Sequence, residues 1–84
     1  MNPRVVAVTP IEHPQLLLTL RSGERRRLDV TPYLAYTVFE RLREPGFFAL
    51  VQAGHGTVSW PGGIDLDPDS VYLESVSFAQ SAAA

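Results

Sequence analysis

Apolar and polar residues alternate along most of the first thirty positions, with the period of two expected of half-buried strands. Arg4–Thr9 is short and rich in β-branched residues, and it is followed by Pro10, which cannot donate a ladder hydrogen bond. Two further alternating runs, Gln15–Leu20 and Glu24–Val30, flank the turn-forming residues Arg21-Ser22-Gly23. The pattern predicts a first strand followed by a β-hairpin.

The hairpin over Gln15–Val30 can take two registers, and the apolar pattern decides between them. A two-residue loop would divide the leucines between both faces of the sheet. A three-residue loop, with Gly23 in the left-handed conformation, pairs Leu16 with Leu28. One face then collects Leu16, Leu18, Leu20, Leu28 and Val30. We predict this register, with Arg26 as the single misfit on that face, near the open end of the hairpin, its stem on the sheet and its head in water.

Capping residues and prolines mark short helices in the rest of the chain. Thr31-Pro32 and Asp67-Pro68 each place an N-cap residue before a proline at the first helical position. The second of these helices should run from Pro68 to about Leu73. Thr37–Glu40 has the spacing of a capping box, and Pro45-Gly46 ends the helix that follows it. These signals predict two or three short helices.

Three later segments add further elements. Phe47–Val51 is apolar and predicts one or two helical turns that lead into a strand. Thr57–Trp60 alternates after the turn at Gly54-His55-Gly56, and Ile64–Leu66 resumes the alternation beyond Pro61-Gly62-Gly63. We expect two more short strands there.

Together the elements predict a single α+β domain. It has a small, mainly antiparallel sheet of four or five short strands, with two or three short helices on one face. The domain spans residues 1–78, and residues 79–84 form a frayed or disordered tail. The expected core consists of Val6, Val8, Leu16, Leu18, Leu20, Leu28, Val30, Leu34, Phe39, Leu42, Phe48, Val58 and Trp60.

Composition excludes several kinds of chemistry. The 84 residues contain no cysteine, which rules out disulfides, thiolate metal sites and cysteine nucleophiles. The net charge of −2 gives no overall attraction to nucleic acid. No apolar run is long enough to cross a membrane, and the N-terminus lacks the pattern of a secretory signal, so we expect a cytoplasmic protein without membrane contact.

The most specific motif is Trp60–Tyr72, which reads Trp-Pro-Gly-Gly-Ile-Asp-Leu-Asp-Pro-Asp-Ser-Val-Tyr. It resembles the signature of a bacterial family known as domain of unknown function 2442, Trp-Pro-Asn-Gly-hydrophobic-Asp followed by a short helix ending near Leu-Tyr. Gly62 stands where that family usually has asparagine, and Val71 replaces the leucine before Tyr72. The resemblance extends over Arg4 to Leu73. Its upstream parts are Gly23-Glu24, Leu28-Asp29-Val30, Pro32-Tyr33-Leu34 and the stretch from Leu42 to Phe48.

The resemblance implies a small α+β domain that occurs alone or beside other modules. Some members are fused to a helix-turn-helix DNA-binding domain, and some are encoded beside a partner in toxin–antitoxin-like pairs. This chain ends soon after the signature, so we expect no fused DNA-binding domain in it.

Four residues are weak candidates for binding through their position in predicted strands and turns. Alternation places Arg25 and Arg27 on one face, where they serve either as anion contacts or as a solvated surface. Asp29 lies on the polar face before a helix start, and a structural role in accepting backbone amides is favoured over a chemical one. Trp60 alternates with Val58, which favours the core over a binding surface.

Asp65 is the fifth candidate, because Asp65, Asp67 and Asp69 have the spacing of the first calcium ligands of an EF-hand. The sixth position is not glycine, and Val76 occupies the twelfth position, where a glutamate is required. The sequence also lacks a nucleophile elbow, a phosphate-binding loop and a His-x-x-x-His pair. We therefore expect no metal, no cofactor and no catalytic residues.

These expectations favour a small protein-interaction module over an enzyme, because the sheet has edges available for strand addition. The expected partner is another protein, with a toxin-like or regulatory protein and a second copy of the chain as candidates. The alternative is a nucleic-acid-binding accessory domain of a transcriptional regulator system, using Arg25 and Arg27 with Arg21 near the turn.

Overall fold

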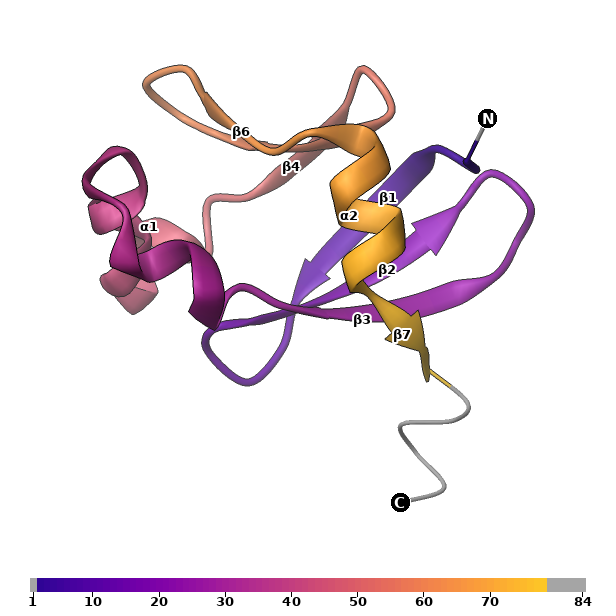
Figure 1. The fold of residues 1–84 in the computed structure, drawn as a ribbon, viewed down its shortest axis with the longest axis horizontal. Coiled ribbons are helices and arrows are strands. Elements are labelled where there is room, and N and C mark those ends of the chain that lie inside the picture. The colour runs from indigo at the N-terminus through magenta and orange to yellow at the C-terminus, as the bar shows by residue number, and fades with distance from the viewer. Residues whose placement is uncertain (1, 79–84) are drawn as a thin grey trace.

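The computed structural model describes residues 2–78, which form two small antiparallel sheets joined by short helices (Figure 1). The larger sheet has the strand order β1-β2-β3-β7 and consists of β1 (Val5–Pro10), β2 (Gln15–Leu20), β3 (Arg25–Asp29) and β7 (Val76–Ser77). The smaller sheet consists of β4 (Gln52–Gly54), β5 (Thr57–Trp60) and β6 (Ile64–Asp65). The α+β class is confirmed, with the strands divided between two sheets where one was expected.

Short helices fill the connections between the strands. Two are 3-10 helices, η1 (Thr31–Ala35) and η2 (Thr37–Arg43), and two are α-helices, α1 (Pro45–Phe48) and α2 (Pro68–Glu74). Figure 1 shows α2 crossing the larger sheet before it runs into β7, while η1, η2 and α1 gather at one side. None of the helices in residues 2–78 has the length and apolar character that a membrane crossing requires.

The hairpin of β2 and β3 has the predicted register. Leu16 lies opposite Leu28, and Leu18 lies opposite Arg26. The backbone N–H of Leu20 donates to the carbonyl of Glu24 at 2.8 Å, which closes the three-residue loop. Gly23 has a φ of 93°, the left-handed conformation that the loop requires.

Substituting Gly23 with alanine should lower the free energy of unfolding by about 1–2 kcal/mol, because a Cβ is strained at this positive φ. Nothing within 4 Å would clash with the added methyl group, so backbone strain alone is tested. Gly46→Ala is the matched control, since Gly46 lies in α1 with equally open space around it. Urea unfolding should show the control as neutral or slightly stabilised. Equal midpoints for the two variants would contradict the loop assignment.

Strand β1 departs from the prediction at Val6, which was expected in the core and is 50% exposed. A bulge lies between Val5, which pairs with Leu20, and Ala7, which pairs with Thr19. The extra residue shifts the alternation of the strand, so that Val5 and Val8 face inward and Val6 faces solvent. The expectation for Val6 was wrong, because a bulge cannot be recognised from the sequence in a run of β-branched residues.

Most helices begin or end at the residues that the capping motifs and prolines predicted. The Asp67 side chain accepts a hydrogen bond from the Ser70 backbone N–H at 3.0 Å and caps α2. Helix η2 ends before Pro45, which opens α1 at the same time. Neither Thr31 nor Thr37 acts as a side-chain cap, so both of those expectations were wrong. The backbone N–H groups of Tyr33 and Phe39, which those caps would have satisfied, donate instead to the carbonyls of Val30 and Tyr36 in the turns of the 3-10 helices.

The core lies between the inner face of the larger sheet, α2 and the smaller sheet. Val8, Leu34 and Phe39, expected inside, are partly buried at its margin. The predicted tail at residues 79–84 lies outside the described residues. The buried core residues are Val5, Leu16, Leu18, Leu20, Leu28, Val30, Leu42, Phe48, Val51, Val58, Trp60, Ile64, Leu66 and Val71.

Candidate functional site

The face of the larger sheet that points away from the core carries the candidate site, and we call it the outer face. Cross-strand pairing aligns Thr9, Leu17, Arg27 and Val76 in one row across all four strands. A second row joins Ala7, Thr19 and Arg25. These seven residues define the outer face.

The two faces of the sheet differ sharply in burial. The inward residues Leu16, Leu18 and Leu20 are at most 1% exposed, whereas every residue of the outer face keeps some accessible surface. Val76 is 45% exposed although it is apolar. The outer face is therefore an accessible surface with apolar, hydroxyl and guanidinium groups side by side.

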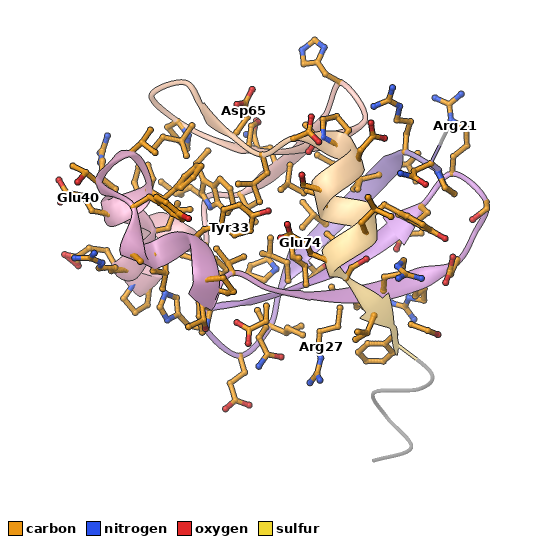
Figure 2. The ribbon with its side chains drawn as sticks, viewed as in Figure 1. Arg21, Arg27, Tyr33, Glu40, Asp65 and Glu74 are labelled. Atoms are coloured by element: carbon orange, nitrogen blue, oxygen red, sulfur yellow. The ribbon has the colours of Figure 1, made fainter. Side chains whose placement is uncertain are left out.

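Arg25 and Arg27 give the outer face a positive charge. Among residues 2–78 neither guanidinium forms a salt bridge or a side-chain hydrogen bond. Figure 2 shows Arg27 projecting from β3 away from α2. The two arginines lie on one face as predicted, and both are available to an acidic group.

Asp29 follows the arginines at the end of β3 and has a structural role. Its Oδ1 atom accepts a hydrogen bond from the Thr31 backbone N–H at 2.9 Å, so it satisfies the first backbone N–H of η1. Hydrogen bonds from the Thr31 side chain and backbone lower the pKa of Asp29, with a smaller contribution from the charge of Arg27. Partial burial opposes this shift without reversing it.

The pKa of Asp29 predicts how stability depends on pH. A carboxyl group whose pKa is lower in the folded state stabilises the fold above its unfolded pKa, and this contribution is lost as the pH falls through the folded pKa. The wild type should therefore lose more stability than Asp29→Asn between about pH 6 and about pH 3. Urea unfolding at the two pH values measures the difference. An identical pH dependence in both proteins would show that the Asp29 charge does not contribute.

Trp60 belongs to the core. It is 4% exposed, and its Nε1–H donates to the Phe48 carbonyl at 2.9 Å. Its ring also contacts the Phe48 ring, with 5.8 Å between centroids. The signature tryptophan thus fixes α1 to β5 and does not present a binding surface.

Asp65 is exposed on β6, and Figure 2 places it at the opposite edge of the molecule from Arg27. Within residues 2–78, no three His, Cys, Asp or Glu side chains lie close enough together to hold a metal ion. Of the five residues singled out in the sequence, the structure brings Arg25, Arg27 and Asp29 together on one strand and leaves Trp60 and Asp65 elsewhere.

The strongest polar centre is one that the sequence placed wrongly. Arg26 lies near the loop of the hairpin, not at its open end, and its head is not directed into water. Its Nε–H and one Nη donate to the Oγ and the carbonyl of Ser75, each at 2.6 Å, and the other Nη contacts the Glu24 carboxylate at 2.7 Å. The guanidinium also lies 4.5 Å from the centre of the Tyr72 ring. In the sequence, the only sign of this polar centre was the position of Arg26 on the leucine face of the hairpin.

The backbone of the loop after Trp60 explains why glycine can stand at position 62, where the signature usually has asparagine. Gly62 has a φ of 89°, a region that glycine and, less easily, asparagine can adopt. A Cβ at this position would lie 3.4 Å from an Nη atom of Arg41, which is an acceptable contact. The position therefore requires a residue that tolerates positive φ, and Gly62 meets this requirement.

Comparison with known proteins gives one match. No curated protein and no solved structure matches the sequence. A family model described as "Protein of unknown function (DUF2442)" matches residues 5–77, which include both sheets, all four helices and the Trp60 loop. The chain therefore belongs to the DUF2442 family of proteins of unknown function.

Proposed function

We propose that this protein is a protein-binding module whose outer face binds a partner surface of acidic and apolar side chains. The observation that carries the proposal is the row Thr9-Leu17-Arg27-Val76, in which apolar groups on neighbouring strands flank an arginine without an ion pair. The proposal needs no catalytic group.

The apolar part of the outer face supplies area for association. Leu17 and Val76 lie on either side of Arg27, and Val76 is 45% exposed. Single exposed apolar residues are ordinary on protein surfaces. Here they are aligned in one row on neighbouring strands, so one partner surface can cover them together and remove their area from water.

The charged part selects the partner. Arginine is enriched in protein interfaces, and its planar guanidinium binds carboxylates through two parallel hydrogen bonds. Arg25 and Arg27 project from the same face of β3, two residues apart. A partner with aspartate or glutamate beside apolar residues would complement this pattern.

Nucleic acid fits the outer face less well. None of the seven residues is aromatic, so bases have no ring to stack on. Two arginines would contact few phosphates, and the chain as a whole carries a net charge of −2. A protein partner is therefore the better candidate.

Charge reversal on the outer face tests the proposal. The wild-type protein is used to capture partners from its native cells, and each recovered protein is then purified and titrated against the variants. Arg27→Glu should weaken a genuine complex at least tenfold, because attraction to acidic groups becomes repulsion. Arg21→Glu is the matched control, because Arg21 is an exposed arginine in the hairpin loop outside the seven residues of the outer face, and binding should be unchanged there.

Two results would overturn the proposal. The first is an Arg27→Glu variant that binds every recovered partner as tightly as the wild type. The second is specific binding of duplex DNA that falls by orders of magnitude between about 50 and 200 mM salt and is lost in an Arg25→Ala/Arg27→Ala variant. Light scattering identifies a second copy of the chain as the partner if the wild type is a dimer and Arg27→Glu is a monomer.

A further inference from the structure

A small pocket opens between η1 and α2 and shares no residue with the outer face. It has a volume of about 150 Å³ and is lined by Pro32, Tyr33, Tyr36 and Glu74. Sites for drug-sized ligands usually measure about 300–1,000 Å³, so this one suits the head group of a side chain or a small molecule. Figure 2 shows Tyr33 and Glu74 meeting between the two helices.

Contacts within the fold hold the walls of the pocket in place. The Tyr33 hydroxyl donates to the Oε1 atom of Glu74 at 2.6 Å, which ties η1 to the end of α2. The Tyr33 ring also packs edge-on against Phe39, with 5.5 Å between ring centroids. Pro32 has a restricted backbone beside them. Tyr36 is 62% exposed and completes the aromatic lining.

The pocket wall carries negative charge from Glu74, with a further contribution from Asp67. Within residues 2–78 the Glu74 carboxylate forms no salt bridge, and its side-chain partner is the Tyr33 hydroxyl. Burial raises the pKa of Tyr33, and the hydrogen bond and charge of Glu74 and the charge of Asp67 raise it further. The neighbouring guanidinium groups are engaged elsewhere, Arg26 by Glu24 and Ser75, and Arg43 by the Leu34 carbonyl.

We propose that this pocket binds an organic cation, an alkylammonium or guanidinium head group. Aromatic faces attract cations through their quadrupoles, and a carboxylate in the same wall adds a counter-charge. An anion would be repelled by Glu74, and a neutral group of the same shape would gain only contact with the rings. The cation comes either from a lysine or arginine side chain of a peptide or from a free amine.

Titration of the full chain, observed by NMR, tests the proposal with defined probes. Tetramethylammonium, n-butylammonium and a short lysine-containing peptide are added at constant ionic strength. All three should shift the signals of Tyr33, Tyr36 and Glu74 in a saturable manner. A peptide that binds more tightly than n-butylammonium identifies a protein side chain as the source, and a peptide that binds more weakly identifies a free amine. The neutral isostere tert-butanol and sodium chloride should produce no such shifts.

Two variants examine the carboxylate and the aromatic wall separately. Glu74→Gln should weaken binding of n-butylammonium about fivefold or more, and Tyr36→Ala should weaken it comparably without disturbing the fold, since Tyr36 is largely exposed. Glu40→Gln is the matched control for loss of an exposed acidic group. Equal responses to tert-butanol and tetramethylammonium would overturn the proposal. So would unchanged affinity in both pocket variants.

Discussion

Replacing Trp60 with alanine is expected to lower the free energy of unfolding by about 3–5 kcal/mol. The indole is 4% exposed, so the substitution leaves a cavity beside Phe48. It also removes the donor to the Phe48 carbonyl, a hydrogen bond of 2.9 Å in a buried setting. Domains of this length have a total stability of about 4–12 kcal/mol, so the variant should be close to unfolding at room temperature.

Urea unfolding followed by circular dichroism measures this loss without relying on tryptophan fluorescence. Trp60→Phe largely separates the two causes, because phenylalanine keeps most of the ring volume and lacks the N–H donor. It should lose about 1–3 kcal/mol, less than the alanine variant. A loss below about 1 kcal/mol for Trp60→Ala would contradict the core assignment of the signature tryptophan.

Replacing Arg26 with methionine is expected to cost about 2–4 kcal/mol of stability. The guanidinium joins β3 to the end of α2 through the Oγ and carbonyl of Ser75, a residue that is 4% exposed. Methionine fills similar space but leaves the Ser75 carbonyl without this donor. Glu24 loses its partner as well, at lower cost because its side chain is 37% exposed.

Arg25→Met is the matched control, since Arg25 is the preceding residue of the same strand and points to solvent. Its stability should stay within about 0.5 kcal/mol of the wild type. Arg26→Lys should recover only part of the loss, because a single ammonium cannot reproduce the planar fork of donors. Equal stabilities for Arg25→Met and Arg26→Met would show that the contacts with Ser75 contribute nothing.

Local patterns predicted the features that depend on neighbours in sequence. The positions of the leucines and Gly23 were sufficient for the register of the hairpin, because a slip by one residue would expose the leucine face. Asp67 before a proline was sufficient for the start of α2. At Thr31 the same rule failed, because the N-cap of η1 is Val30, so Thr31 already lies inside the helix and the Tyr33 backbone N–H donates to the Val30 carbonyl.

Features that depend on distant segments could not be predicted. Arg26 and Ser75 are 49 residues apart, and Tyr33 and Glu74 are 41 residues apart. No alternation or capping rule connects such pairs, so neither the polar centre nor the pocket between η1 and α2 was visible in the sequence. The arginines of the outer face were predicted to share one side. Val76 was missed because a strand of two residues has no periodicity to read.

The position of Arg26 among leucines also affects the chain before it is complete. The hairpin joins residues close in sequence and can form early during synthesis, whereas Ser75 is added 49 residues after Arg26. Until α2 docks, the Arg26 guanidinium and its partner Glu24 interrupt the leucine face of the hairpin near its loop, and Ser75 does not yet cover the charge of Arg26. Such a charge opposes association between nascent chains, as gatekeeper residues do beside aggregation-prone strands. A leucine at this position would give a more cohesive hairpin and a chain more prone to aggregate while it is being made.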